Sequence, residues 1–287
     1  MKRFLTIILS ALLITVLSGC SVQSYSTYEE SDKYTASVSA NLTDKIDEIK
    51  INWVSGSVKI ETYDGETVKF SEISSLDKQN DAIGEATENK TLNESLKMRY
   101  TVSGGKLIIQ FCKSGLRIRS SAVSDLKKDL TIYVPADCTF KAIDAELASA
   151  DLYINGVTAD KIKCDNMSSE NKYVDCAVNE ITVNTMSGNT TVNTKDKLKK
   201  MTYNAMSGNM TVDAEGIDAL DVSSMSADIS LNVKNADFTL KLTGVTASLE
   251  ANGINYEKTE EKAYKFGDGN GKINFDSTSG KVSVNVK

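Results

Sequence analysis

The chain has 287 residues, with 33 basic and 39 acidic side chains, and its net charge at pH 7 is −6. It contains no histidine, which excludes hydrolases that use imidazole and metal sites with histidine ligands. The excess of acidic residues argues against a nucleic-acid partner, because a surface that holds phosphates needs an excess of basic side chains.

The N-terminus has the pattern of a lipoprotein signal peptide. Residues 1–3 are positively charged at two positions, and residues 4–17 form a charge-free apolar run, shorter than the roughly 20 residues that span a membrane. The sequence Leu-Ser-Gly-Cys at 17–20 resembles the bacterial lipobox. In lipoproteins with this motif, the cysteine carries acyl chains such as palmitate and becomes the first residue of the mature protein. We therefore predict that residues 1–19 are a lipoprotein signal peptide and that Cys20 is the lipidation site, which lowers the mature charge to −8 because two basic residues are removed. An ordinary signal peptide is the alternative.

The next part of the chain is irregular. Residues 20–40 are rich in Ser, Thr and Tyr and are predicted to form a flexible tether, although part of the segment could instead pair as a first strand. Residues 41–135 are predicted as an irregular N-terminal β region that contains a polar surface insert at 71–97. The only proline, Pro135, closes this region, and β-solenoid repeats are expected over 136–287.

A pattern of two short strands joined by a corner recurs along the chain. Residues 181–192, 201–212 and 220–231 share it closely, and weaker copies begin at 49, 143, 162, 240 and 273. Each corner carries a hydroxyl followed by Gly, Ala or Ser, which permits a tight bend. The predicted corner residues are Ser55, Ser149, Ser168, Ser187, Ser207, Ser226, Thr246 and Ser279, of which the third to seventh follow the preceding one by 19 or 20 residues.

The apolar residues of the copies alternate with polar ones, which indicates strands with one buried face. A repeat of about twenty residues is too short to include a helix and fits one rung of a β-solenoid, in which strands stack roughly 4.8 Å apart around a continuous core. We therefore predict an all-β fold, a right-handed β-helix-like solenoid with rungs of about 19–20 residues. The alternative is an antiparallel β-sandwich.

Two details of the stack follow from this prediction. One column of the repeats consists of methionines, and we expect it to be an internal ladder beside the corner: Met167, Met186, Met206 and Met225. The final copy, 273–286, is expected to form the last rung, whose edge needs cover that the loop at 256–272 could supply.

Two sets of polar and aromatic side chains are candidate binding groups. Residues after the corners stack into an outer polar ladder, which could bind a sugar or a cation or could be a solvated face: Asp151, Glu170, Asn189, Asn209 and Asp228. Four tyrosines could form an aromatic strip for glycan stacking, but the last two fall in apolar columns and are expected in the core: Tyr133, Tyr153, Tyr173 and Tyr203.

Four cysteines remain after the lipidated one, namely Cys112, Cys138, Cys164 and Cys176. Free buried thiols and one disulfide are both open for an exported protein. A Cys138–Cys176 bridge is disfavoured, because two rungs separate these residues by about 9.6 Å, beyond the roughly 7 Å limit between Cα atoms. No close cysteine pair is present, so we predict no metal site. The acidic residues are spread along the polar ladder without a matching column of Arg or Lys, so we predict no catalytic residue, and no cofactor is expected.

The repeats resemble the bacterial putative-adhesin domain family, whose members carry serial strand–Ser–Gly–strand copies on exported proteins. The matching residues are Met-Ser-Gly at 186–188 and 206–208, Tyr-Val-Pro at 133–135, Phe-Gly-Asp-Gly at 266–269 and Thr-Ser-Gly at 278–280. The resemblance covers about residues 40–287 and implies a β-helix-like solenoid on the cell exterior. The insert at 71–97 departs from the family pattern.

The features together predict a cell-envelope lipoprotein whose solenoid surface binds an envelope protein or a glycan without catalysis. Its lipid would hold it on the outer face of the cytoplasmic membrane, or on the outer membrane of a Gram-negative cell. Two alternatives stay open: an envelope-stress or scaffolding component that engages membrane regulators, and a carbohydrate-active β-helix enzyme with clustered Asp and Lys.

Overall fold

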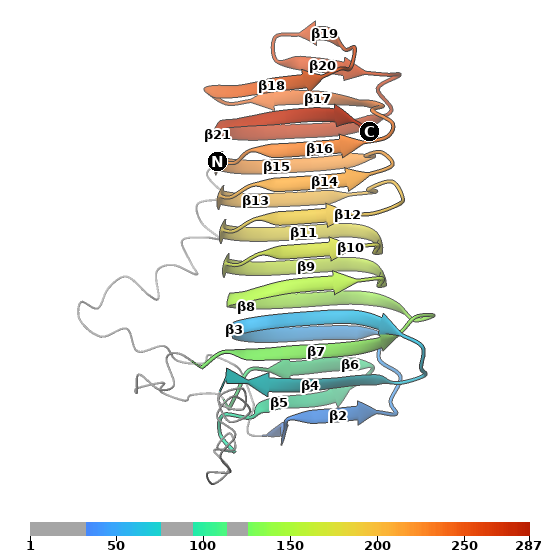
Figure 1. Ribbon diagram of the computed structural model, residues 1–287, viewed down its shortest axis with the longest axis vertical. Coiled ribbons are helices and arrows are strands. Elements are labelled where there is room, and N and C mark those ends of the chain that lie inside the picture. The colour runs from blue at the N-terminus through green and yellow to red at the C-terminus, as the bar shows by residue number, and fades with distance from the viewer. Residues whose placement is uncertain (1–32, 76–93, 114–125) are drawn as a thin grey trace, which may run out of the picture.

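The computed structural model describes residues 33–75, 94–113 and 126–287. The predicted signal peptide, Cys20 and residues 20–32 of the predicted tether lie outside this part of the chain. Every element named within it is a strand, and none of its helical turns is long and apolar enough to cross a membrane (Figure 1). The fold is therefore all-β, as predicted. The strands are β1 (Thr35–Ser37), β2 (Ser39–Leu42), β3 (Glu48–Tyr63), β4 (Val68–Ser74), β5 (Met98–Ser103), β6 (Lys106–Gln110), β7 (Lys128–Pro135), β8 (Thr139–Asn155), β9 (Thr158–Ser168), β10 (Asn171–Val174), β11 (Ala177–Ser187), β12 (Thr190–Asn193), β13 (Met201–Ser207), β14 (Met210–Ala214), β15 (Ala219–Ser226), β16 (Ile229–Val233), β17 (Phe238–Thr243), β18 (Thr246–Asn252), β19 (Glu257–Glu260), β20 (Ala263–Phe266) and β21 (Gly271–Val286).

The repeats form rungs of two strands that pair in parallel with the rungs on either side. Strand β11 pairs with β9 and with β13, and the register aligns Ile181 with Ile162 and with Met201. Strand β12 pairs with β10 and β14 in the same way. Residues one period apart are therefore neighbours in space, an arrangement consistent with the predicted solenoid. Because β8 to β18 pair only in parallel with one another and with β21, the repeats are not an antiparallel sandwich.

The apolar columns identified in the repeats make up the core. Both columns of the first strand are at most 3% exposed in all eight copies. Stacking places each side chain between two equivalents, so each column becomes a continuous buried ladder. Tyr173 and Tyr203 are 1% and 0% exposed, which confirms that these two tyrosines belong to the core. The first column is Ile49, Ile143, Ile162, Ile181, Met201, Leu220, Leu240 and Ile273, and the second is Ile51, Ala145, Cys164, Val183, Tyr203, Val222, Leu242 and Phe275.

The last copy of the repeat lies inside the stack, contrary to the expectation that it forms the final rung. Strand β21 pairs with β15 and β16 on one side and with β17 and β18 on the other (Figure 1). The 33-residue step from Thr246 to Ser279 contains β18, β19 and β20, and this added length lets the chain return and insert β21 between β16 and β18. The loop at 256–272 contributes β20, which covers the edge of β17 rather than that of β21.

The opposite end is interleaved in the same manner and closed by antiparallel strands. Strand β3 pairs in parallel with β6 and β7 on one side and with β8 on the other (Figure 1). Strands β4 and β5 run antiparallel to β7 and β6, and β2 and β1 pair with them in turn. Residues 35–40, the end of the predicted tether, are therefore part of the folded body, as the strand alternative expected. The insert predicted at 71–97 begins later, because β4 continues to Ser74.

Candidate functional site

The corner hydroxyls stack into one column on the surface of the molecule. Register pairs the following residues: Ser55 with Ser149, Ser168 with Ser187, Ser187 with Ser207, Ser207 with Ser226, Ser226 with Ser279, and Ser279 with Thr246. The small residue that follows is needed for close approach: Gly208 has φ +128°, and a Cβ there would lie 2.1 Å from the carbonyl oxygen of Gly188. The column of corner residues therefore marks the tight bend between the two strands of each rung.

Side chains of the polar ladder beside the corners form hydrogen bonds with the backbone of the neighbouring rung. Oδ1 of Asp151 accepts a hydrogen bond from the backbone N–H of Glu170 at 2.9 Å. Oδ1 of Asn189 accepts one from Asn209 N–H at 3.1 Å, and Asn209 in turn accepts one from Asp228 N–H at 3.3 Å. Each side chain thus caps the corner of the next rung, where the bend leaves the backbone without a partner. These contacts favour the structural interpretation of the ladder over a binding site.

Three tyrosines and three lysines gather on the outer face of the second-strand sheet. This tyrosine–lysine face consists of Tyr63, Tyr133, Tyr153, Lys59, Lys69 and Lys172, and it is formed by β3, β4, β7, β8 and β10. Nζ of Lys69 lies 4.1 Å from the ring centroid of Tyr63 and 5.2 Å from that of Tyr133. The two rings meet edge to face at 6.1 Å. Such cation–π and edge-to-face contacts hold the rings in fixed orientations.

Tyr153 lies between two lysines of neighbouring rungs. The register places Lys59 and Lys172 beside it, and each Nζ is 5.8 Å from its ring centroid. The hydrogen bond from Lys59 to Glu61, 2.6 Å long, raises the pKa of that lysine. Tyr133 and Tyr153 were predicted from the sequence as candidate glycan contacts, but the lysines were not, because strand pairing brings them together from separate segments.

A hollow of about 410 Å³ opens on this face around Tyr153. It combines an aromatic ring with ammonium donors and carboxylate acceptors, which are the groups that bind the apolar face and the hydroxyls of a sugar ring. A second hollow of about 360 Å³ lies further along the same sheet and is lined by polar residues of β10, β12 and β14. The first hollow is lined by Ser57, Val58, Lys59, Asp151, Leu152, Tyr153, Glu170 and Lys172.

The methionine column faces solvent, so the prediction of an internal ladder was wrong. Met167 and Met225 are 50% and 58% exposed, and Met186 and Met206 are partly exposed. The alternation of the strand continues to the corner: Thr185 points inward and is buried, and the methionine after it therefore points outward. We call these four residues the methionine stripe.

Acidic and basic residues also alternate on the outer face of the first-strand sheet. Asp144 lies between Lys50 and Lys163 in the register, and burial raises the pKa of its carboxyl group. Lys50 pairs with Glu146 at 2.9 Å, and Lys163 pairs with Asp165. This row is the nearest match to the clustered Asp and Lys of the enzyme alternative, but the two hollows described above are lined by other residues.

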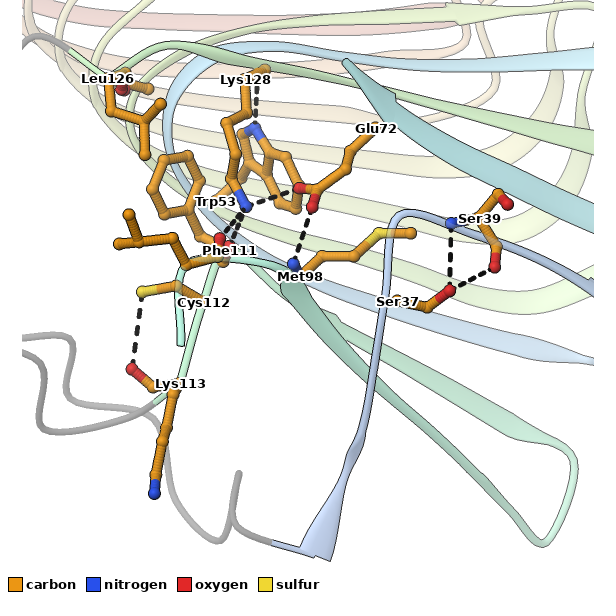
Figure 2. Close-up of polar contacts among 12 residues, drawn as sticks. Ser37, Ser39, Trp53, Glu72, Met98, Phe111, Cys112, Lys113, Leu126 and Lys128 are labelled. Atoms are coloured by element: carbon orange, nitrogen blue, oxygen red, sulfur yellow. Dashed lines mark hydrogen bonds and ion pairs between the residues drawn. The ribbon is translucent and has the colours of Figure 1, made fainter. Parts of the chain in front are cut away.

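One lysine is enclosed at the N-terminal end of the stack (Figure 2). Lys128 and Glu72 are both 0% exposed at their side chains, and Nζ lies 2.5 Å from Oε2. Nζ also donates to the backbone oxygens of Leu96, at 2.9 Å, and Phe111. Burial lowers the pKa of Lys128, and the charge of Glu72 opposes this shift. A lysine with a shifted pKa can be catalytic. Here the ammonium group is hydrogen-bonded to its three acceptors and is closed off from solvent, so we interpret the Glu72–Lys128 pair as structural.

The four described cysteines are all free thiols in the structure. Of the two possibilities that the sequence left open, the structure therefore has free thiols and not a disulfide. Cys112, Cys164 and Cys176 are buried, and Cys138 is partly exposed. Burial raises the pKa of Cys164 to about 12. In the described part of the chain, no three Cys, Asp or Glu side chains come together as a metal site.

The comparisons with known proteins concern nearly the whole folded body. The family model described as Toastrack DUF4097 matches residues 46–287, which confirms the family resemblance seen in the repeats. None of the curated proteins matches the chain.

Three solved structures are similar at low identity. A putative cell adhesion protein from Clostridium sporogenes ATCC 15579 is 12% identical with a TM-score of 0.39, covering 89% of this chain and 100% of that one. A putative lipid binding protein from Parabacteroides distasonis ATCC 8503 is 12% identical with a TM-score of 0.41, covering 85% and 95%. A putative adhesin from Bacteroides fragilis NCTC 9343 is 10% identical with a TM-score of 0.31, covering 86% and 96%.

Proposed function

The chain belongs to the Toastrack DUF4097 family, a domain family of unknown function, and from this premise we propose that it is an exported, lipid-anchored envelope protein that binds a glycan polymer without catalysis. The proposed scaffold is a right-handed β-solenoid, and the proposed anchor is Cys20. The anchor is supported by the Leu-Ser-Gly-Cys motif after an apolar run of signal-peptide length. The bound partner is inferred from the tyrosine–lysine face.

The tyrosine–lysine face carries the proposal. Its rings are held in place by neighbouring lysines on an open face, so they can stack on sugar rings without first being ordered. Around Tyr153, carboxylates and ammonium groups are available as partners for hydroxyl groups. The face extends over several rungs and is not enclosed, which suits a polymer better than a small molecule.

The test is co-sedimentation of the full-length protein with insoluble cell-wall polysaccharide. We expect a Y133A/Y153A variant to bind at least about fivefold more weakly, because each of the two aromatic contacts contributes about 0.5–1.5 kcal/mol. Tyr256→Ala is the matched control, since Tyr256 is an exposed tyrosine at the opposite end of the stack. The control should bind as the unaltered protein does.

Two results would overturn the proposal. Failure of the unaltered protein to sediment with any wall polysaccharide would contradict the proposal that its partner is a glycan. Equal binding by the unaltered protein and the Y133A/Y153A variant would show that the face is not the site. Release of soluble sugar fragments from the polymer would instead support the carbohydrate-active alternative and contradict a role without catalysis.

A further inference from the structure

The methionine stripe has the chemistry of a soft-metal site, and we propose that it binds Cu(I) through thioethers of neighbouring rungs. The stripe contains four of the eight methionines of the chain, each on the next rung of the stack. Thioether sulfur is a ligand that selects Cu(I) among the metal ions available to proteins. The inference is independent of the proposed glycan partner, because it concerns the other sheet and a different ligand.

The spacing of the rungs suits two-coordinate binding. Neighbouring strands lie about 4.8 Å apart, so equivalent side chains on adjacent rungs are separated by the same distance. Metal–sulfur bonds in proteins are about 2.3 Å long, so two sulfurs in linear coordination are about 4.6 Å apart. Met186 and Met206 are such a pair, since the residues on both sides of them are in register. The three rotatable bonds of methionine absorb the small remaining difference.

Packing does not account for these methionines. They face solvent, whereas Met98, Met201 and Met210 are buried in the core. An exposed strand position is filled best by a β-branched or aromatic residue, and methionine contributes no special stability there. Exposure leaves the sulfur atoms accessible to an ion from solution.

The ends of the stripe define the number of ligands. The register places Ala148 beside Met167 at one end and Thr278 beside Met225 at the other, and neither residue offers sulfur. Four thioethers on four consecutive rungs can therefore hold at most two ions at once, since each ion takes two neighbouring methionines. Because thioethers are neutral and soft, Zn²⁺ and Ca²⁺, which prefer thiolate, imidazole or oxygen, are not expected to bind here.

The experiment follows the methyl signals of methionines during titration of the full chain, labelled at the methionine methyl carbon. Ag(I) serves as a redox-inert probe and Cu(I) is added under anaerobic conditions, after alkylation of the accessible thiol of Cys138. We expect the signals of the four stripe methionines to shift. The signals of the buried Met98, Met201 and Met210 are the internal control and should not move.

Two double variants separate adjacency from the mere number of thioethers. M186L/M206L leaves two methionines three rungs apart, too far to share an ion, and should weaken binding at least tenfold. M167L/M225L keeps the adjacent central pair and should bind within about threefold of the unaltered protein. Equal loss in both variants, or no shift of stripe signals in the unaltered protein, would overturn the proposal. Circular dichroism checks that both variants are folded.

Discussion

Replacement of Glu72 by leucine is the sharpest test of how the N-terminal end of the stack is held together. In the native fold the carboxylate of Glu72 contacts the buried ammonium group of Lys128 at 2.5 Å and accepts the backbone N–H of Met98 at 2.9 Å (Figure 2). The Glu72→Leu change leaves a buried positive charge without its counter-ion. Removing one partner of a buried pair costs about 3–5 kcal/mol of unfolding free energy. We therefore expect Glu72→Leu to lower stability by this amount.

A second variant distinguishes the charge effect from a packing defect. In E72L/K128M no buried charge remains. The Met98 N–H lacks its acceptor in both variants, and the double variant also loses the two hydrogen bonds from Lys128 to the carbonyls of Leu96 and Phe111, each contributing about 1 kcal/mol. The double variant should still be more stable than Glu72→Leu alone. The control is Glu61→Leu, which removes the partly exposed partner of the exposed Lys59 and should change stability by less than about 1 kcal/mol.

The measurement is urea unfolding followed by circular dichroism at several pH values. Burial lowers the pKa of Lys128, so between the folded pKa and the unfolded value of about 10.4 the unfolded chain binds more protons. Stability therefore rises with pH in this window. Loss of Glu72 lowers the folded pKa further, and the deficit of Glu72→Leu should shrink as pH rises toward 10. A deficit below about 1 kcal/mol, or one that stays constant up to pH 10, would refute this account.

Two further predictions concern the cysteines. Of the four cysteines in the described part of the chain, a thiol reagent at pH 8 should label only Cys138 in the native protein, because Cys164 is buried with a pKa of about 12 and Cys112 and Cys176 are also buried; all four should react in guanidinium chloride without reductant, and fewer than four would indicate a disulfide. Cys20→Ala should move the protein from the membrane fraction to the soluble fraction, whereas a Ser21→Ala control should leave it in the membrane; a Cys20→Ala protein that stays with the membrane would contradict the lipid anchor.

Most of the fold could be predicted from the period of the sequence repeat. Ile162, Ile181 and Met201 occupy the same column of the sequence pattern and the same column of the core, because a side chain in a parallel stack is always covered by its equivalent one period away. The same reasoning located Tyr173 and Tyr203 in the core. The methionine stripe was assigned to the wrong side: alternation continues through the buried Thr185, so Met186 after it points outward.

Only the tyrosines of the candidate site could be predicted from the sequence. Tyr133 and Tyr153 could be identified as possible glycan contacts, but the lysines of the tyrosine–lysine face come from three separate strands, of which β4 lies outside the repeats. Lys69 reaches Tyr133 because β4 runs antiparallel to β7, a pairing that no local pattern encodes. The buried contact between Glu72 and Lys128 was missed for the same reason, since 56 positions of sequence separate the two residues.

The sequence by itself determined the all-β class, the rung length and the buried columns, because these depend on alternation and period, which are local properties of the chain. The order of rungs at both ends was decided only by tertiary structure. Strand β3 lies between β7 and β8, and β21 lies between β16 and β18, since a strand with suitable alternation can pair with any rung that the connecting segments allow it to reach. Tertiary pairing also decided which polar side chains share a face, and therefore where the proposed binding surfaces lie.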